Sequence, residues 1–172
     1  KLANDLYVAA GLHPPHAEHV LLTINGDYQG VYTQNEQVDE GFLLSSGRNP
    51  DASIYKVVGR FMEALPSESA YRLSYEKKTN EALGYDDLIQ FIELVNNTSD
   101  EEFAVSIGQV LDVESYLSYY ALIVLTSNFD SATHNVYLVH DLETGLWELI
   151  PWDLEASFRL ADAAINLGSL ED

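Results

Sequence analysis

Cysteine is absent from this chain of 172 residues, and cations are scarce, with 8 Lys and Arg against 28 Asp and Glu. Without cysteine there is no disulfide framework, thiolate metal site or cysteine nucleophile. The formal net charge of −20 argues against broad contact with nucleic-acid phosphates or an anionic membrane surface, because both need Lys and Arg. No apolar run approaches the length of about 18 residues typical of a membrane-spanning helix. We therefore expect neither nucleic-acid nor membrane partners.

The chain does contain enough apolar residues to fold. Hydrophobic residues make up 47% of the sequence, and the 11 Tyr, 6 Phe and 2 Trp are too many aromatics for a disordered acidic tail. The length suggests one domain. Because the sequence opens at Lys1 without a Met and already within a helical pattern, we expect an internal piece of a longer protein.

The first part of the chain predicts a short helix followed by a β-hairpin. Helical spacing of apolar residues, with a glycine stop, predicts a helix over residues 2–10. An apolar run over 19–24 and a return strand expected over 28–34 flank Asn25 and Gly26. This dipeptide is typical of a type I′ turn, in which both central residues need positive φ.

Helices dominate the expected structure beyond the hairpin. A strand is expected over 53–58, and residues 63–80 are polar without a regular pattern. Apolar residues at helical spacing predict helices over 86–95 and over 113–125, the second buried nearly all round towards its end. Ser99 is expected to cap another helix between them. Hairpins separated from helices indicate an α+β architecture.

The candidate functional residues gather between Ser127 and Glu155. The apolar helix leads to Asp130 in a loop, and Asn135 follows five residues later at the mouth of a second hairpin. That hairpin ends at Asp153, which brings a second carboxylate back to the loop. Carboxylate and amide oxygens suit Mg²⁺ or Mn²⁺ bound together with substrate phosphates.

The order of these three residues is that of a protein kinase. There, the catalytic-loop Asp is followed five residues later by a metal-binding Asn, and a hairpin leads to a metal-binding Asp. Asp130, Asn135 and Asp153 reproduce this order and interval. The alternative is that Asp130 and Asn135 are ordinary loop residues and that Asp153 caps a short helix.

Histidines give weaker signals. His13, His16 and His19 share no helix face because two prolines follow the first, so a surface cluster is favoured over a zinc site. His140 is expected to face solvent from a strand, whereas Trp147 is expected in the core.

Several blocks of sequence stand out together. IPWDLE-x-SF covers residues 150–158, preceded by HN-x-YLV-x-D over 134–141 and TG-x-W over 144–147. These blocks resemble the CotH family of spore-coat and secreted atypical protein kinases, whose pattern is roughly HNYYLY, GKW and IPWDLD-x-SFG. The similarity extends from about residue 2 to 160 and includes Ile54-Tyr55-Lys56.

The resemblance implies one kinase-like domain over residues 1–172. An incomplete small lobe, made of a β-hairpin and a helix, would extend with the hinge to about residue 60, and a helical large lobe would cover 61–172. The implied activity is ATP-dependent transfer of phosphate to Ser or Thr hydroxyls of a coat or extracellular protein, with Mg²⁺ or Mn²⁺. Because the enzyme is acidic, we expect a basic segment of the substrate as the acceptor. The resemblance also implies that the protein is located in the spore coat or is secreted.

The family pattern also implies a role for each matching residue. Asp130 resembles the catalytic carboxylate that orients or deprotonates the acceptor hydroxyl, and Asn135 and Asp153 resemble the metal ligands. The hinge that would meet adenine through its backbone corresponds to Glu36, Gln37 and Val38.

Two departures keep a second reading open. Glu155 stands where the family has Asp, and Arg159 stands near the usual Gly. The family's N-terminal strands, with the phosphate-covering loop and ATP-binding Lys, are not among these residues, and Lys56 is no obvious substitute because it follows the hinge. The alternative is a non-catalytic acidic structural or binding module of a spore coat or extracellular complex. In a further version, Ca²⁺ bound by the same carboxylates stabilises the domain.

Overall fold

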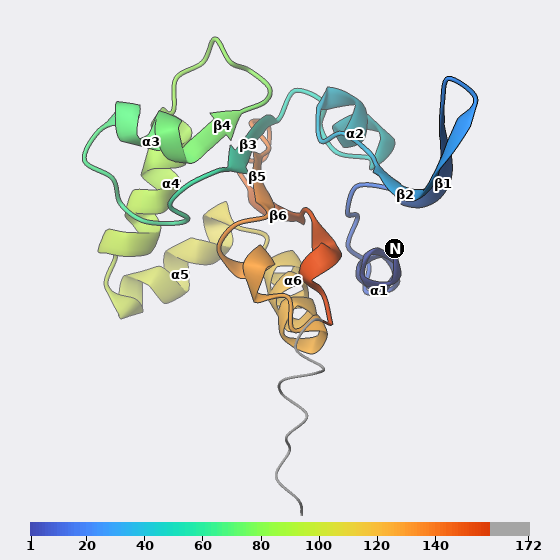
Figure 1. Ribbon diagram of the computed structural model, residues 1–172. Coiled ribbons are helices and arrows are strands. Elements are labelled where there is room, and N and C mark those ends of the chain that lie inside the picture. Colours follow the sequence, from blue (N-terminus) through green and yellow to red (C-terminus); the bar gives the residue numbers. More distant parts are fainter. Residues whose placement is uncertain (159–172) are drawn as a thin grey trace, which may run out of the picture.

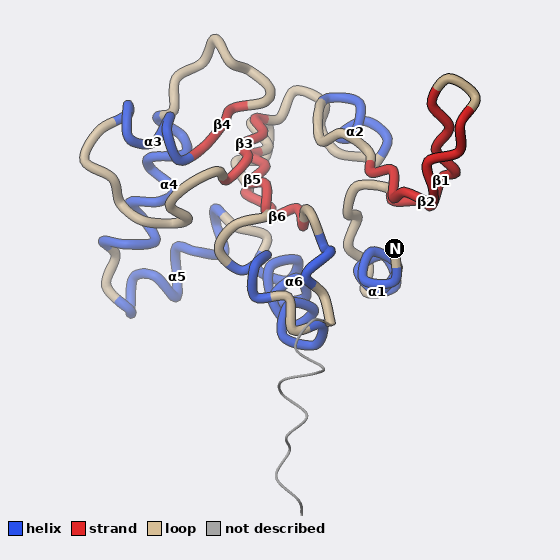
Figure 2. The backbone as a smooth tube through the Cα atoms, viewed as in Figure 1, coloured by secondary structure: helices blue, strands red, loops and turns tan. Residues whose placement is uncertain are grey.

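Two antiparallel sheets contain the strands of the computed structural model, which describes residues 1–158 (Figure 1). The first is a hairpin of β1 (Ala17–Ile24) and β2 (Asp27–Asn35). The second has the order β4 (Tyr75–Lys77), β3 (Ser53–Val57), β5 (Val136–His140) and β6 (Trp147–Pro151). Figure 2 shows the hairpin standing apart from the larger sheet. The predicted α+β class is confirmed.

Six α-helices and two short 3-10 helices accompany the strands within residues 1–158. The α-helices are α1 (Leu2–Ala9), α2 (Glu40–Ser45), α3 (Glu68–Ser74), α4 (Asp86–Asn97), α5 (Asp100–Val110) and α6 (Val113–Thr126). The 3-10 helices are η1 (Phe129–Ala132) and η2 (Leu154–Ala156). Ser99 caps α5 by accepting a backbone N–H group, as predicted, and Asp112 caps α6 in the same way. Within the described part of the chain, no helix combines the length and the apolar character that crossing a membrane requires.

The first hairpin forms where the sequence predicts it. Asn25 and Gly26 have φ values of 53° and 91°, so both central residues of the turn are left-handed. This backbone matches the right-handed twist of the flanking strands. Ile24 pairs with Asp27 across the turn, and one irregularity in register lies between Leu22 and Thr23.

The larger sheet is buried on both faces. On β5, Val136 and Leu138 belong to one apolar cluster, whereas Tyr137 and Val139 belong to another. This alternation follows from the two-residue period of a strand. The first cluster packs α4 and α6 against the sheet, and the second packs α2 and the Val38 side chain against the opposite face.

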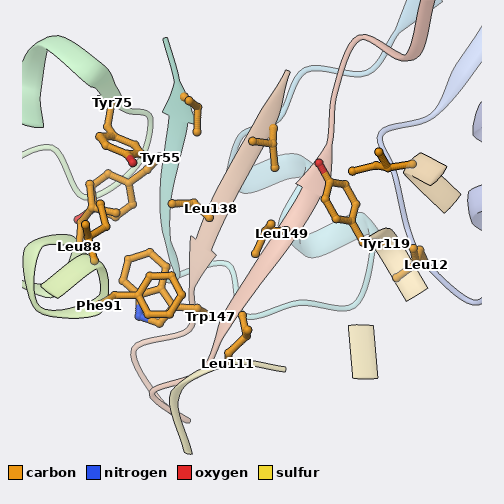
Figure 3. Packing of buried hydrophobic residues seen from close by; sticks show 14 of the residues in the cluster. Leu12, Tyr55, Tyr75, Leu88, Phe91, Leu111, Tyr119, Leu138, Trp147 and Leu149 are labelled. Atoms are coloured by element: carbon orange, nitrogen blue, oxygen red, sulfur yellow. The ribbon is translucent and has the colours of Figure 1, made fainter. Parts of the chain in front are cut away.

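Trp147 belongs to the first cluster and lies against Phe91 (Figure 3). Its ring stacks on Phe91 of α4 at 4.7 Å between centroids and on His140 at 4.4 Å. The prediction that Trp147 lies in the core is confirmed, because only 3% of this residue is exposed. The stack joins helix α4 to the hairpin of β5 and β6.

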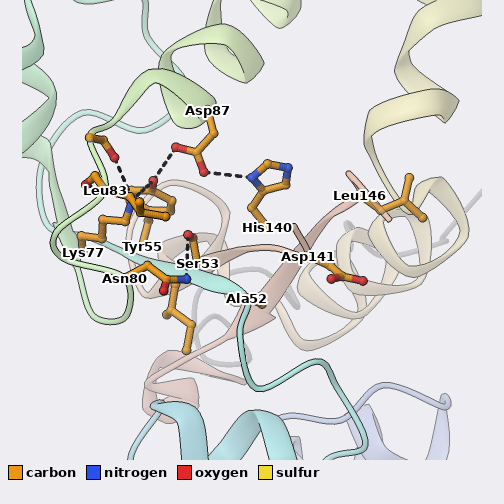
Figure 4. Close-up of polar contacts among 12 residues, drawn as sticks. Ala52, Ser53, Tyr55, Lys77, Asn80, Leu83, Asp87, His140, Asp141 and Leu146 are labelled. Carbon is orange, nitrogen blue, oxygen red and sulfur yellow. Dashed lines mark hydrogen bonds and ion pairs between the residues drawn. The ribbon is translucent and has the colours of Figure 1, made fainter. Parts of the chain in front are cut away.

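His140 does not face solvent, contrary to expectation. Its Nδ1 lies 2.9 Å from Asp87 Oδ2, and its side chain is 15% exposed. Tyr55 Oη donates to Asp87 Oδ1 at 2.6 Å, and Lys77 Nζ donates to Tyr55 Oη at 2.7 Å (Figure 4). The prediction was wrong because α4 covers this end of the sheet, and the local sequence of β5 does not indicate a helix that is distant in the chain.

Residues 63–80 contain regular structure that the sequence pattern did not predict. They form α3 and the edge strand β4, which pairs with β3. Tyr71 and Tyr75 bury their rings, and their hydroxyl oxygens accept the backbone N–H groups of Leu65 and Met62. Tertiary burial of two tyrosines, rather than local periodicity, therefore organises this segment.

The end of α6 is not buried all round, so that expectation was also wrong. Tyr119, Leu122 and Ile123 are buried, but Val124 and Leu125 are 52% and 68% exposed. Helix α6 packs with α1 and β6 on one side only. Its outer face is apolar without being covered by any described residue.

Candidate active site

The loop that carries Asp130 begins where α6 ends. Ser127 has a left-handed backbone, with φ of 54°, and the N–H of Asn128 donates to the Ile123 carbonyl at 3.0 Å. A left-handed residue at a helix C-terminus satisfies carbonyls that have lost their helical partners and turns the chain away. The turn passes directly into η1, which contains Asp130.

Asn128 fixes this loop from inside. The residue is fully buried. Its Oδ1 accepts the Ser131 N–H at 3.4 Å, and its Nδ2 donates to Ser157 Oγ at 3.2 Å. The amide therefore ties the loop after α6 to the segment after β6. Sequence reasoning did not single out Asn128, and the available signal was an amide placed directly after an apolar helix.

Asp130 and Asn135 form a hydrogen-bonded pair. Asn135 Nδ2 donates to Asp130 Oδ2 at 2.6 Å, and the Asp130 carbonyl accepts the His134 N–H at 2.9 Å. The five-residue interval thus forms a turn that these two hydrogen bonds to Asp130 close. Asp130 is 52% exposed at its side chain, and His134 Nδ1 lies 4.0 Å from its Oδ1. Because the Asn135 nitrogen donates to Asp130, the Asn135 Oδ1 is the atom suited to ligate a cation.

The second hairpin returns Asp153 to the same end of the sheet. Val136 pairs with Pro151, and the Trp152 N–H donates to the Asn135 carbonyl at 2.9 Å. Asp153 follows at once, with a left-handed φ of 51°. Non-glycine residues hold this backbone only where their surroundings enforce it, and such positions cluster at functional sites. Asp153 precedes η2, but its side chain makes no capping hydrogen bond there, which disfavours the capping alternative.

A polar pocket of about 300 Å³ lies against Asp153. Glu155 lines it from the same segment, Lys1 and Asn4 line it from the N-terminal helix, and Asn35 lines it from β2. The pocket therefore lies between the first hairpin with α1 and the end of the second hairpin. Asp130 and Asn135 are not among its lining residues, although Trp152, whose N–H donates to the Asn135 carbonyl, is one of them. Sequence reasoning missed Lys1, Asn4 and Asn35, which no motif marks.

The three residues of the predicted hinge lie between β2 and α2. Glu36 accepts the His16 N–H and the Ser45 hydroxyl through its carboxylate, and its own N–H donates to the His16 carbonyl. Val38 is fully buried, and Gln37 is exposed. None of them lines the polar pocket. Contact of this segment with adenine stays a prediction.

The oxygen donors fit a divalent ion that is shared with a nucleotide. Among residues 1–158, no three His, Cys, Asp or Glu side chains converge as a self-sufficient metal cluster. Mg²⁺ characteristically takes one or two carboxylates and completes its shell with water and phosphate oxygens. Asp153 with the Asn135 amide oxygen supplies a set of this kind. The His13, His16 and His19 alternative gains no support, because no such cluster includes them.

The fold and these side chains define an α+β domain with a carboxylate, an amide and a second carboxylate at one end of a hairpin. The chain belongs to the CotH family: it matches the family described as CotH kinase protein over residues 1–169. It is also similar to the inner spore coat protein H of Bacillus subtilis (strain 168), with 34% identity over 165 residues. The match covers 92% of this chain and 45% of that relative, so the chain spans less than half the relative's length. The predicted family is confirmed.

The departures from the family pattern fall at the edge of the described structure. Glu155 is exposed and lines the polar pocket beside Asp153. Its carboxylate is therefore in the same wall, although it is one methylene longer than the Asp of the family. Arg159 lies outside the described residues.

Proposed function

We propose that this chain is the core of an atypical protein kinase of the spore coat, which transfers phosphate from ATP to Ser or Thr hydroxyls of a protein. The observation that carries the proposal is the Asp130–Asn135 hydrogen bond on the loop beside the returning Asp153. Family membership and the similarity to a spore coat protein support it. The kinase-like fold, with a small lobe to residue 60 and a large lobe beyond, is part of the proposal.

Each polar side chain has a distinct role in this reaction. Asp130 orients the acceptor hydroxyl and takes its proton, because its carboxylate is exposed and held by Asn135. Asn135 and Asp153 would hold Mg²⁺ or Mn²⁺. The bound ion supplies positive charge that stabilises the negative charge of the transferred phosphoryl group. In this class of reaction, positioning and electrostatics provide most of the rate enhancement.

The polar pocket is the natural place for the nucleotide. It is bounded by the hairpin and α1 on one side and by Asp153 and Glu155 on the other. Lys1 is the cation of its lining, and its Nζ lies 2.6 Å from Asp5 Oδ1. Because the described residues place two carboxylates and one cation in the wall, we expect ATP binding to depend on the divalent ion. The net charge of −20 favours a basic segment as the acceptor.

The same acidic wall favours one alternative function. A non-catalytic acidic module would keep the fold and bind a basic coat component, and Ca²⁺ could stabilise it through Asp153 and Glu155. The specific observation is that, among residues 1–158, Lys1 is the one cation lining the polar pocket, whereas kinases place several donors on the phosphates.

Thermal unfolding with ligands separates the two functions. The full-length protein should gain stability with ATP and Mg²⁺ together, by about 2.7 kcal/mol when the ligand is at about 100 times its Kd. For a domain of this size, that gain raises Tm by several degrees. Asp153→Asn should abolish the rise, and Asp27→Asn, at the tip of the first hairpin, should leave it intact. A rise with Ca²⁺ alone and none with nucleotide would contradict the kinase and support the acidic module.

A further inference from the structure

Lys and Arg are absent from a long stretch of the chain, residues 79–158. Residues 79–158 contain 15 Asp and Glu and no Lys or Arg. This stretch includes α4, α5 and α6 with their connections. The surface built from these three helices is therefore a single-sign surface, which attracts cations and repels other acidic molecules.

An apolar groove opens in this acidic surface. It has a volume of about 430 Å³ and is lined by residues of α4, α5, α6 and β6, helices and a strand whose arrangement Figure 1 shows. All eleven lining side chains are apolar or aromatic, and they include Met62, Phe103, Ile107, Leu117 and Leu149. The volume falls in the range of specific ligand sites, which is about 300–1,000 Å³.

Residues 1–158 leave the walls of the groove incompletely covered. Helix α5 buries none of its eleven residues, although Phe103 and Ile107 lie four positions apart on one face and are only half-buried. Leu117 on α6 is 59% exposed. An amphipathic helix normally hides such a face against a partner, and burying it yields about 25 cal/mol per Å². Helices α5 and α6 therefore present apolar surface whose burial would stabilise a complex.

Met62 is held at the edge of the groove in a strained conformation. It is the chain's single methionine, and its φ of 54° is left-handed. Tyr75 Oη accepts its N–H at 2.8 Å, and its carbonyl accepts from Asn96 Nδ2 at 2.9 Å. Neither contact comes from a neighbouring residue in the chain. Strain maintained by such contacts is typical of ligand-binding positions, and methionine adapts its shape to apolar partners.

Exposed carboxylates flank the lining residues in the sequence. Glu101 and Glu102 precede Phe103, Asp112 and Glu114 flank Val113, and Glu63 follows Met62. Arg60 is the nearby cation, and it is already paired with Glu63 at 3.3 Å. Residues that line the groove therefore have exposed carboxylates as their sequence neighbours.

We propose that this groove docks an amphipathic helical segment of a partner protein, with apolar side chains in the groove and Lys or Arg at its edges. A helix in an apolar groove inserts side chains at positions i, i+3, i+4 and i+7. Complementary charge at the rim gives the partner its identity and accelerates association. A second copy of this chain is disfavoured as the occupant, because it brings its own charge of −20 to an acidic surface. The proposal goes beyond phosphoryl transfer and does not depend on it.

A synthetic peptide tests the docking site without nucleotide. The probe is a fluorescent helix of about 16 residues with Leu at i, i+3, i+4 and i+7 and Lys elsewhere. Its matched control carries Glu in place of Lys. Fluorescence anisotropy with the full chain should detect binding of the Lys peptide and at least about tenfold weaker binding of the Glu peptide. Raising NaCl from about 50 mM to about 500 mM should weaken the Lys peptide further.

Two matched substitutions on α6 locate the site. Leu117→Lys, in the groove, should raise the Kd of the Lys peptide about tenfold or more. Leu125→Lys, which is 68% exposed on the same helix outside the groove, should leave the Kd within about twofold. Because both leucines are exposed, both variants should fold, which circular dichroism checks. Should Leu117→Lys unfold, Glu101→Lys and its distant control Glu143→Lys give the same comparison.

Several results would overturn the docking proposal. Equal affinity for the Lys and Glu peptides would show that charge does not select the partner. Equal effects of Leu117→Lys and Leu125→Lys on the Kd would show that the peptide does not bind in the groove. If the Lys peptide does not bind, the groove does not dock a basic helix. If sedimentation shows a dimer that Leu117→Lys dissociates, the groove binds a second copy of the chain instead.

Discussion

Asp87 is the residue where polar side chains from three elements meet. It links α4 to Tyr55 on β3 and to His140 on β5, and Lys77 on β4 extends the network through the Tyr55 hydroxyl. Burial alone raises the pKa of Asp87, but hydrogen bonds from His140, Tyr55 and the Leu88 backbone outweigh it and hold the pKa below its ordinary value. Burial also lowers the pKa of Lys77. The network therefore favours a charged Asp87 at neutral pH.

Asp87→Asn should lower the free energy of unfolding by about 1–3 kcal/mol at pH 7, because it weakens two hydrogen bonds to a charged acceptor in a mostly buried place. A depressed pKa in the folded state stabilises the protein above the unfolded value, about pH 4, and this contribution is lost as pH falls through the folded pKa. Urea unfolding of both proteins between about pH 7 and pH 3 measures this. The wild-type protein should lose more stability on acidification than Asp87→Asn. Parallel losses in both proteins would contradict the role of Asp87.

At the scale of elements, two glycines make a matched pair. Gly26 has a φ of 91° in the first hairpin, whereas Gly108 lies inside helix α5 with open space where a Cβ would be. Gly26→Ala should destabilise the hairpin by about 1–2 kcal/mol, because an L-residue is strained in the left-handed region. Gly108→Ala should stabilise α5 by up to about 1 kcal/mol, since alanine is the better helix former.

Hydrogen exchange localises both effects. The amides of β1 and β2 should exchange faster in Gly26→Ala, and those of α5 should exchange more slowly in Gly108→Ala. An isolated two-stranded ribbon is only marginally stable, so the hairpin is a sensitive reporter. If the two alanine variants shift exchange in the same direction, the backbone argument fails.

The elements that local chemistry specifies could be predicted from sequence. The Asn25-Gly26 turn, the Ser99 cap and the second hairpin formed as expected, because each depends on a few adjacent residues. The segment 63–80 could not be predicted, since its order comes from tyrosines that are buried by distant parts of the chain. The prediction that His140 faces solvent was wrong for the same reason, because its partner Asp87 lies 53 positions away in the sequence.

The candidate site divides in the same way. The interval between Asp130 and Asn135 marked both residues as candidates, and their roles stay predictions, whereas the hydrogen bond between them comes from the structure. The polar pocket combines Lys1 and Asn4 with Asp153 and Glu155, and no local pattern relates residues so far apart. Such a pocket can be seen only once the hairpins and α1 are in place.

At the scale of the whole molecule, the charge of −20 destabilises the folded state through self-repulsion. Raising NaCl from about 10 mM to about 150 mM shortens the Debye length from about 30 Å to about 8 Å and should raise Tm. Choline chloride should give the same rise as NaCl, because screening does not depend on the cation's identity. A Tm that is independent of salt would mean that the carboxylates are too well dispersed for repulsion to matter.

The central claim is phosphoryl transfer by Asp130 beside Asn135 and Asp153, and transfer of label from γ-labelled ATP to a basic, Ser-rich peptide tests it most directly. The full-length protein should label the peptide in the presence of Mg²⁺ or Mn²⁺. Asp130→Asn should lower the rate by at least about a hundredfold, in line with loss of a positioned general base, while the ATP-dependent rise in Tm is retained. Asp27→Asn should keep the wild-type rate. Undiminished transfer in Asp130→Asn, or no transfer by the wild-type protein despite ATP binding, would contradict the account.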